Sequence, residues 1–446
     1  MQHSNVANRL DRLPISSFHK YILIAVSFAY FFEFADINTF AAVAPQLIKT
    51  WGITVNMIAY VTSLSFLGMF FGSAAGGWLA DYFGRKKALL YTTLGFSLLS
   101  LANAFAWDIW SLGFFRVATS AGLSAMTVVA VIYINEIYPA RFRGKYQAYA
   151  IVIGICGTPA TNLIASFVVP LAPWAWRLLF VWGALGILYL LFSKKIVESP
   201  RWHESRGEYD KADEVMSFIE NEVAGEKGQL PEPVCYAPSA PQDNKTPFAA
   251  LFQKKYLGRT ILLTVLWVTQ TIGFFGYSSW APTLLAKEGF SVERSIFYVA
   301  LTTIGAPLGP FVASLITDRF ERKWCLAVFG IIIGASGLLY GLTFNPVYIV
   351  VFGFVVNLFE RGFTALAYAY SPELYDTKVR SLGTGFSYGL GRLSNAFGPL
   401  MIAFLYNGFG YRYVFFFIAG TWFLGSIAVA VFGPKTMQAR SQCSTT

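Results

Sequence analysis

The sequence predicts an all-α integral membrane protein, with twelve transmembrane helices in two pseudo-symmetric bundles of six. Three observations predict this fold class. The 446 residues are 55% hydrophobic and only 13% charged, which is too little polar material to cover a soluble protein of this size. Apolar segments long enough to cross a bilayer run through almost the whole chain. Short polar motifs between these segments recur at one fixed separation, as expected of a duplicated chain.

Twelve apolar segments have the length of about 20 residues that a helix needs to span the hydrocarbon core. They cover residues 20–46, 56–80, 88–105, 110–138, 146–170, 176–193, 258–285, 294–317, 324–343, 346–371, 382–405 and 412–433. The first segment is too long for a signal peptide, and no small-residue cleavage site follows it. We therefore take it as the first membrane helix.

The break between the sixth and seventh segments divides the chain into three parts. We expect a first bundle at residues 1–193, a cytoplasmic linker at 194–257 and a second bundle at 258–446. Within the linker, residues 198–216 predict a short amphipathic helix on the inner surface. The proline-rich residues 228–247 predict a flexible segment that lets the two bundles move against each other.

The distribution of basic residues explains the net charge of +10 without a nucleic-acid partner. If the amino terminus lies inside, most lysines and arginines fall in inner segments. The outer loops then hold only Lys49, Arg177, Lys287, Arg294 and Arg412. This asymmetry follows the positive-inside rule and places both termini and the linker in the cytoplasm. The short outer loops suit the inner membrane of a bacterium, so we expect a multi-pass protein in that bilayer.

No residue pattern predicts a catalytic or metal site. The four cysteines lack metal-ligand spacing, and the three histidines lie outside the apolar segments or at their inner edges. An enzyme would need a nucleophile with a base, or a metal cluster. We therefore expect no enzyme activity, no metal and no cofactor. The expected partner is a small-molecule substrate, handled by a monomer.

A short basic loop joins the second and third segments. Residues 77–87 read GWLADYFGRKK. Gly84 permits a tight turn with positive φ. Asp81 can accept hydrogen bonds from a helix terminus or an arginine, and Arg85 can pair across to the other bundle. Such pairs at the membrane edge can form in one conformation and break in another.

The acid and the bases of this loop return in the second half, which a plain basic turn would not explain. Residues 318–323 (DRFERK) are a worn copy of the loop, and residues 133–139 (YINEIYP) recur as 370–376 (YSPELYD). Matching residues are 237 positions apart: Asp81 and Asp318, Glu136 and Glu373, Arg143 and Arg380. With two residues that follow the sixth segment, the predicted gating set is Asp81, Gly84, Arg85, Glu136, Arg143, Glu198, Arg201, Asp318, Arg322, Glu373 and Arg380.

These motifs resemble those of the major facilitator superfamily, over nearly the whole chain. Arg116 with Gly122, and residues 198–202 (ESPRW), are similar to the sugar-porter branch. The resemblance implies transport by alternating access. Residues 270–282 and 357–362, however, lack the Gln-Leu-Ser-like and Pro-x-x-Trp stretches of hexose carriers.

The carboxyl-terminal half is more similar to the organic-ion, aromatic-acid and niacin proton symporters. The resemblance lies in residues 371–375 (SPELY) and in Gly391 with Arg392. The fifth segment lacks the dense glycine–proline pattern of proton-antiporting drug exporters, which favours uptake over export.

Charged residues inside the apolar segments are few, and each is costly unless it is paired or in contact with water. At a helical rise of about 1.5 Å per residue, Asp36 and Arg116 lie at similar depth, so they can meet. The resemblance implies the same pairing, because proton-coupled sugar porters join an acid of the first helix to this arginine. A carboxylate released from an arginine can take up a proton. We predict Asp36, Glu33 and Arg116 as proton-coupling residues; a static ion pair in a uniporter is the alternative.

Further polar residues lie near the bilayer midplane, where carriers bind their substrates. Arg392 can hold a carboxylate through two hydrogen bonds, or it can form an ion pair with Glu360 that only fastens two helices together. Glu360 and Arg361 are adjacent, so we expect them to point to different faces with separate partners. Two aromatic residues can line the cavity or only fill space. The predicted substrate-binding residues are Arg392, Gln270, Glu360, Arg361, Tyr277 and Trp280.

Two transport functions fit these residues. The first is proton-coupled uptake of a small organic anion, such as an aromatic or pyridine carboxylate. The second is transport of a sugar or polyol by proton symport or uniport. A membrane sensor or enzyme is a third class, for which the sequence offers no chemical machinery. The proton gradient is the only energy source that the first function needs.

Overall fold

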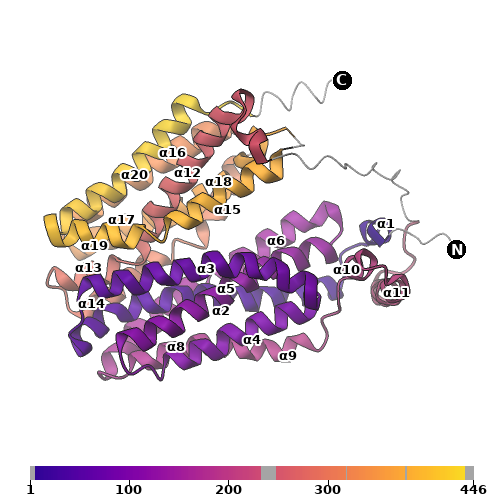
Figure 1. Ribbon diagram of the computed structural model, residues 1–446, viewed down its shortest axis with the longest axis horizontal. Helices are drawn as coiled ribbons and strands as arrows, with labels where there is room; N and C mark the ends of the chain where they lie inside the picture. Colours follow the sequence, from indigo (N-terminus) through magenta and orange to yellow (C-terminus); the bar gives the residue numbers. More distant parts are fainter. Residues whose placement is uncertain (1–5, 233–247, 318, 377–378, 437–446) are drawn as a thin grey trace.

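The computed structural model describes residues 6–232, 248–317, 319–376 and 379–436. Within these residues, every regular element is a helix. The helices form two elongated bundles that lie side by side, one from each half of the chain (Figure 1). The predicted all-α class and the two bundles are therefore confirmed.

Six membrane segments make up the first bundle. They are α2 (Ser17–Trp51), α3 (Val55–Phe83), α4 (Arg85–Asn103), α5 (Ile109–Ile137), α6 with α7 (Ala140–Ile155, Gly157–Val168) and α8 with α9 (Trp176–Ala184, Tyr189–Ser193). Short 3-10 turns follow α7 and separate α8 from α9.

Six more segments make up the second bundle. They are α12 with α13 (Lys254–Ser278, Ala281–Lys287), α14 with α15 (Val292–Thr303, Leu308–Thr317), α16 (Arg322–Leu342), α17 (Pro346–Tyr370), α18 with α19 (Arg380–Ser394, Gly398–Phe409) and α20 (Tyr411–Phe432). All twelve predicted segments are thus helical.

Ten segments within the described residues are long and apolar enough to cross a membrane on their own. The two others have local reasons to fall short. Three basic residues begin α4, and the eleventh segment is interrupted between α18 and α19. Each still packs into its bundle: α4 packs against α5, and α18 packs against α12.

Glycines show the duplication directly in the helix contacts. α3 packs closely on α5, and in the second bundle α14 and α15 pack on α17. A Cβ atom on Gly68 would lie 2.5 Å from the Val117 carbonyl oxygen, and one on Gly305 would lie 2.7 Å from the Phe354 carbonyl oxygen. Gly305 is 237 residues after Gly68, and Phe354 is 237 residues after Val117. The same close approach of two backbones therefore occurs once in each half.

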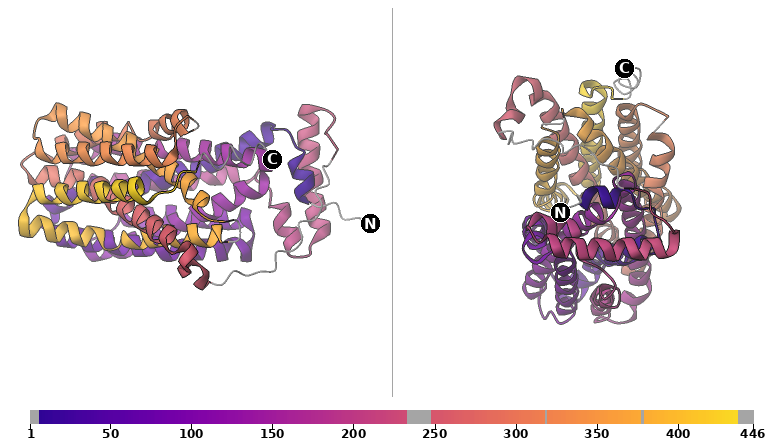
Figure 2. Two further views of the ribbon diagram at one scale, coloured as in Figure 1. Left: turned by 90° about the horizontal axis from the view of Figure 1, so that it is seen from above. Right: turned by 90° about the vertical axis from the view of Figure 1, so that its right-hand side faces the viewer.

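Three further helices form a cap at one end of the first bundle. They are α1 (Val6–Asp11), α10 (Pro200–Ser205) and α11 (Tyr209–Lys227). Figure 2 shows α11 running across the ends of the membrane helices. The sequence predicted one short helix at 198–216; two helices form instead, and the second continues to Lys227. An apolar face that α11 shares with α1 explains this extension: Val6, Leu10, Met216, Ile219 and Val223 are all buried there.

Carboxylates from the cap, and from the segment just before α10, cover the first turns of three membrane helices. Glu226 accepts a hydrogen bond of 2.6 Å at the start of α2, Glu198 one of 2.7 Å at the start of α4, and Asp11 one of 2.7 Å at the start of α6. Backbone N–H groups in a first helical turn have no partner within the helix, and the helix dipole favours a negative charge there. The cap therefore completes the ends of the first bundle.

The two bundles pack against each other at the end opposite the cap. α7 packs on α14, α19 on α3, and α13 on α2. Asn407 donates a hydrogen bond of 2.7 Å to Asn56 across this contact. The segments concerned lie at the far ends of their helices, so the molecule is closed on the side away from the cap.

Candidate functional site

A buried ion pair joins α2 to α5. Arg116 Nη1 lies 2.5 Å from Asp36 Oδ1, and the side chains of the two residues are 4% and 0% exposed. Ser100 of α4 donates a hydrogen bond to the second oxygen of Asp36. Gly183 of α8 has no side chain and so makes space for this carboxylate, because a Cβ there would lie 2.6 Å from the same oxygen. The expected contact between Asp36 and Arg116 is confirmed. Ser100 and Gly183 were missed, since small residues at these positions carry no distinctive sequence signal.

A small cavity borders this ion pair. Arg116 lines it together with hydroxyl groups from Thr62, Ser65 and Ser120 of the first bundle and Ser279 of the second. Its volume is about 30 Å³, which is room for one or two water molecules. The ion pair therefore lies beside a small space between the bundles, which hydroxyl groups and apolar side chains line together.

Glu33 lies one helical turn before Asp36, but it has different partners. Its side chain is buried, one oxygen accepts a hydrogen bond from Thr127 of α5, and the other is buried without a hydrogen-bond partner. The charges that act on its carboxylate are those of Arg361 and Arg392, from the second bundle. Glu33 thus belongs to the interface between the bundles and not to the ion pair of Asp36.

Glu360 lies at the centre of a polar cluster in the second bundle. Gln270 donates hydrogen bonds to Glu360 Oε1 at 3.1 Å and to Thr364 at 3.0 Å. Thr364 in turn donates to Glu360 Oε1 at 2.9 Å. Two predicted residues, Gln270 and Glu360, are therefore in contact. Thr364 was missed, although its spacing of four residues from Glu360 on one helix is a usable signal.

The expectation that Glu360 and Arg361 need separate partners is wrong. Arg361 Nε lies 3.4 Å from Glu360 Oε2, close enough for an ion pair, although neither atom forms a hydrogen bond there. Both side chains are long enough to bend toward each other around the helix. The Arg361 guanidinium also lies over two rings, 4.5 Å from that of Phe274 and 5.6 Å from that of Phe34 on the first bundle.

Arg392 does not pair with Glu360, contrary to the alternative considered from sequence. Its Nε donates a hydrogen bond of 2.7 Å to the hydroxyl of Tyr388, one turn earlier on α18. Among the described residues, Arg392 forms no ion pair within 4 Å. Tyr388, Tyr368 and Trp267 form an aromatic cluster beside it, with ring centroids 4.9 to 5.6 Å apart. In a chain with 17% aromatic residues, no pattern distinguishes these three.

Tyr277 and Trp280 are packed within the second bundle. Tyr277 is 3% exposed with its ring 5.1 Å from that of Tyr340, and Trp280 is 1% exposed. These positions support the alternative in which both residues only fill space. Neither residue belongs to the aromatic cluster beside Arg392.

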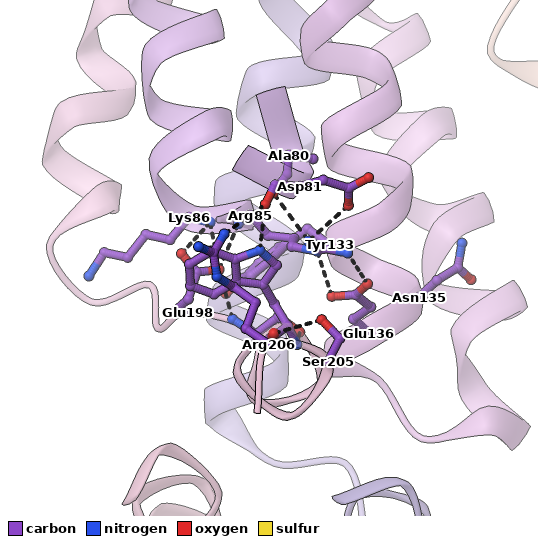
Figure 3. Close-up of polar contacts among 12 residues, drawn as sticks. Ala80, Asp81, Arg85, Lys86, Tyr133, Asn135, Glu136, Glu198, Ser205 and Arg206 are labelled. Atoms are coloured by element: carbon purple, nitrogen blue, oxygen red, sulfur yellow. Dashed lines mark hydrogen bonds and ion pairs between the residues drawn. The ribbon is translucent and has the colours of Figure 1, made fainter. Parts of the chain in front are cut away.

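Arg85 binds within its own bundle, which corrects the expectation that it pairs across to the other. Its guanidinium lies 2.8 and 2.9 Å from the two oxygens of Glu136 and 3.2 Å from Asp81 (Figure 3). Gly84 has the predicted positive φ of 90°. A Cβ there would lie within 3 Å of the Glu198 carboxylate, which accepts hydrogen bonds from the backbone of Arg85 and Lys86. The approach of Glu198 requires the glycine.

The second bundle repeats this ion pair. Arg322 pairs with Glu373, and both this pair and that of Arg85 and Glu136 span 51 residues. Arg380 is held by the Tyr375 carbonyl oxygen at 3.5 Å. Asp318 lies outside the described residues.

Arg201 lies in α10 of the cap, and the positive charge of Arg143 acts on it. Burial lowers the pKa of the Arg201 guanidinium, and the positive charge of Arg143 lowers it further. Asp11 and Glu136 act in the opposite direction. Two of the predicted gating residues thus interact in an environment that disfavours one of their positive charges.

The chain can be compared with known proteins. A family model described as "Sugar (and other) transporter" matches residues 16–441. The chain is 48% identical over 438 residues to the "Putative metabolite transport protein YyaJ" of Bacillus subtilis (strain 168), covering 97% of this chain and 96% of the relative. It is 29% identical over 416 residues to the niacin transporter NiaP of Acinetobacter baylyi, covering 92% of this chain and 93% of the relative.

Among solved structures, the partially occluded inward open conformation of the xylose transporter XylE from E. coli is similar in fold. The TM-score is 0.75 at 15% sequence identity, covering 94% of this chain and 99% of that chain. At this identity the likeness supports the fold alone. The extent of the family match and the 48% identical relative together settle the family. The chain belongs to the sugar (and other) transporters of the major facilitator superfamily, and it is a multi-pass membrane transporter and not an enzyme.

Proposed function

We propose that this transporter is a proton symporter that takes up a small organic anion, an aromatic or pyridine carboxylate. One observation carries this proposal: a buried carboxylate–arginine pair, Asp36 with Arg116, is separate from a central site with two further arginines, Arg361 and Arg392. The first group suits proton binding and the second suits an anion. The likeness to the niacin transporter NiaP supports the same substrate class.

The positive-inside rule orients the molecule. It places the cap and both termini in the cytoplasm of a bacterial cell, with the chain as a monomer in the inner membrane. Because the bundles are closed together at the end opposite the cap, this conformation is the one that faces inward.

Proton coupling would use the pair of Asp36 and Arg116. In the closed pair the carboxylate accepts hydrogen bonds from Arg116 and Ser100. When the pair opens, the carboxylate loses its positive neighbour and can take a proton from water in the adjacent cavity. Protonated Asp36 no longer attracts Arg116, which changes the contact between α2 and α5 and allows the two bundles to rock against each other. A proton gradient would thereby drive the conformational change, with no cofactor.

Substrate binding would use the centre of the interface. A guanidinium binds a carboxylate through two parallel hydrogen bonds, and among the described residues no carboxylate lies within 4 Å of Arg392. Trp267, Tyr368 and Tyr388 provide ring surfaces beside it. An aromatic acid can therefore place its carboxylate on the arginine and its ring on these side chains.

Uptake into proteoliposomes tests the proposal. Labelled nicotinate should accumulate when the outside is acidic, and a protonophore should abolish the accumulation. Asp36→Asn should lose accumulation but keep exchange of labelled for unlabelled nicotinate. Uptake that is insensitive to the protonophore would contradict proton coupling.

A sugar or polyol carrier is the alternative, because the family model includes sugar transporters. Competition distinguishes the two. Excess benzoate should reduce nicotinate uptake and excess xylose should not. If xylose reduced nicotinate uptake, benzoate did not, and labelled xylose was itself taken up, the substrate would be a sugar and not an organic anion.

A further inference from the structure

The centre of the interface holds four ionisable side chains whose charges balance. Glu33 comes from the first bundle, and Glu360, Arg361 and Arg392 come from the second. Two carboxylates thus face two guanidiniums. On the proposed function, on which this inference rests, a substrate carboxylate would add one more negative charge. An uncompensated charge in a buried site is costly, so its entry requires that one of the carboxylates be neutralised or removed.

The two carboxylates differ in how firmly they are held. Glu360 accepts hydrogen bonds from Gln270 and Thr364 at one oxygen, and its other oxygen lies 3.4 Å from Arg361. Glu33 accepts only the hydrogen bond of Thr127, and its second oxygen is buried with no hydrogen-bond partner. A side chain that is 95% buried with one oxygen unsatisfied can gain by taking a proton.

The positive charges that face Glu33 come from across the interface. Arg361 of α17 lies over the ring of Phe34, the next residue after Glu33, and Arg392 of α18 also acts on the carboxylate. Around Glu33 in the first bundle, α6 contributes neutral Gln147, which donates to Tyr30 one turn before Glu33, and α5 contributes Thr127. Asp36, one turn later on α2, is paired with Arg116.

We infer that Glu33 serves as the counter-ion of Arg361 and Arg392 in the empty carrier, and that it takes up a proton when a substrate carboxylate replaces it. The proton comes from water and binds to the carboxylate oxygen of Glu33. Proton and monoanion together add no net charge to the site. Substrate binding is then linked to the uptake of a proton at Glu33. This proton is distinct from the one that Asp36 carries for turnover.

Calorimetry on the purified full-length protein measures this linkage. Nicotinate is titrated in two buffers of different ionisation enthalpy at one pH, and the difference in heat gives the number of protons taken up. In Glu33→Gln, binding should persist with one proton fewer than in the wild type. Its affinity should also become less dependent on pH, whereas the wild-type affinity should fall by up to about tenfold per pH unit.

Glu360→Gln tests the charge balance, since it removes the other central carboxylate. The substrate carboxylate then takes the place of the missing negative charge, so this variant should also bind nicotinate with one proton fewer than the wild type. Equal proton uptake by the wild type and Glu33→Gln would overturn the inference and leave the proposed function intact. Failure of the wild type to bind nicotinate or benzoate would overturn both.

Infrared difference spectroscopy of the wild type needs no variant and covers the case in which Glu33→Gln does not fold. Binding of nicotinate should produce the C=O band of a protonated carboxyl group and remove a carboxylate band. A difference spectrum without a new protonated carboxyl band would overturn the inference.

Discussion

Arg85 and Arg322 occupy equivalent positions in the two halves, 237 residues apart, and each pairs with a glutamate 51 residues further along the chain. Each pair is formed within its own bundle. In the conformation that is closed away from the cap, each ion pair therefore ties together helices of its own half. Their expected role is to hold each bundle rigid while the two bundles rock. They are not expected to connect one bundle to the other.

Arg85→Gln should slow transport more than it weakens substrate binding. It removes a guanidinium that binds both oxygens of Glu136 and leaves this carboxylate without its main partner. Losing a charged hydrogen bond costs about 1.5–3 kcal/mol, so the initial rate of nicotinate uptake should fall at least roughly tenfold. The affinity in calorimetry should change by less than about threefold, because the site lies elsewhere in the molecule.

Lys86→Gln provides the control for that experiment. Lys86 lies in the same loop and loses the same charge, but its side chain forms no ion pair among the described residues. Uptake by this variant should stay close to that of the wild type. A large loss of affinity in Arg85→Gln with normal turnover would contradict the structural role given to Arg85.

Gly68→Ala should destabilise the first bundle. A Cβ atom at this position would lie 2.5 Å from the Val117 carbonyl oxygen, so α3 and α5 must separate. Overpacking of this kind costs about 1–3 kcal/mol of unfolding free energy. Gly77 on the same helix has open space where its Cβ would be, and Gly77→Ala should not destabilise, since alanine favours a helix over glycine. Thermal unfolding in detergent compares the two variants.

The helices and the duplication could be predicted because their causes are local or periodic. Bilayer thickness dictates the length of each apolar segment, and the shared spacing of Asp81, Glu136 and Arg143 with their copies is visible in the letters. The depth of Asp36 and Arg116 followed from helical rise alone. These predictions needed no knowledge of side-chain conformation.

Contacts that depend on side-chain bending or on helix rotation were not accessible in the same way. Adjacent residues on a helix point apart at their Cα atoms, yet Glu360 and Arg361 meet because both side chains are long. Arg85 was expected to reach the other bundle, but Glu136 lies closer within its own. The aromatic side chains beside Arg392 are brought there by the packing of α12, α17 and α18, which no local pattern encodes.

Glu226→Gln should remove a pH-dependent contribution to stability at the start of α2. The hydrogen bond from the Ser17 backbone, with help from Lys227, lowers the pKa of Glu226 to about 2. A carboxylate with a lowered folded-state pKa stabilises the fold above its unfolded pKa of 4.5, and this contribution is lost as pH falls from there toward 2. The wild type should therefore melt above Glu226→Gln at pH 6, and the difference should shrink at pH 3.

Glu222 tests whether the position of Glu226 matters. It is an exposed carboxylate one turn earlier on α11. Glu222→Gln should leave the pH profile of the melting temperature unchanged. Equal effects of the two variants would indicate a general charge effect and not the hydrogen bond to Ser17.

Arg392→Lys should separate the geometry of the guanidinium from its charge. Lysine keeps the positive charge but cannot offer two parallel hydrogen bonds to a carboxylate. It also lacks the Nε donor through which the Tyr388 hydroxyl, at 2.7 Å, orients the Arg392 guanidinium. Loss of one charged hydrogen bond corresponds to a roughly 10- to 100-fold weaker affinity for nicotinate.

Tyr388→Phe, which keeps the arginine and removes only its orienting acceptor, should weaken binding less, by up to about tenfold. Nicotinamide, which has the same ring without the carboxylate, should bind the wild type and both variants with one weak affinity. Arg392 would have no part in substrate recognition if Arg392→Lys bound nicotinate as the wild type does.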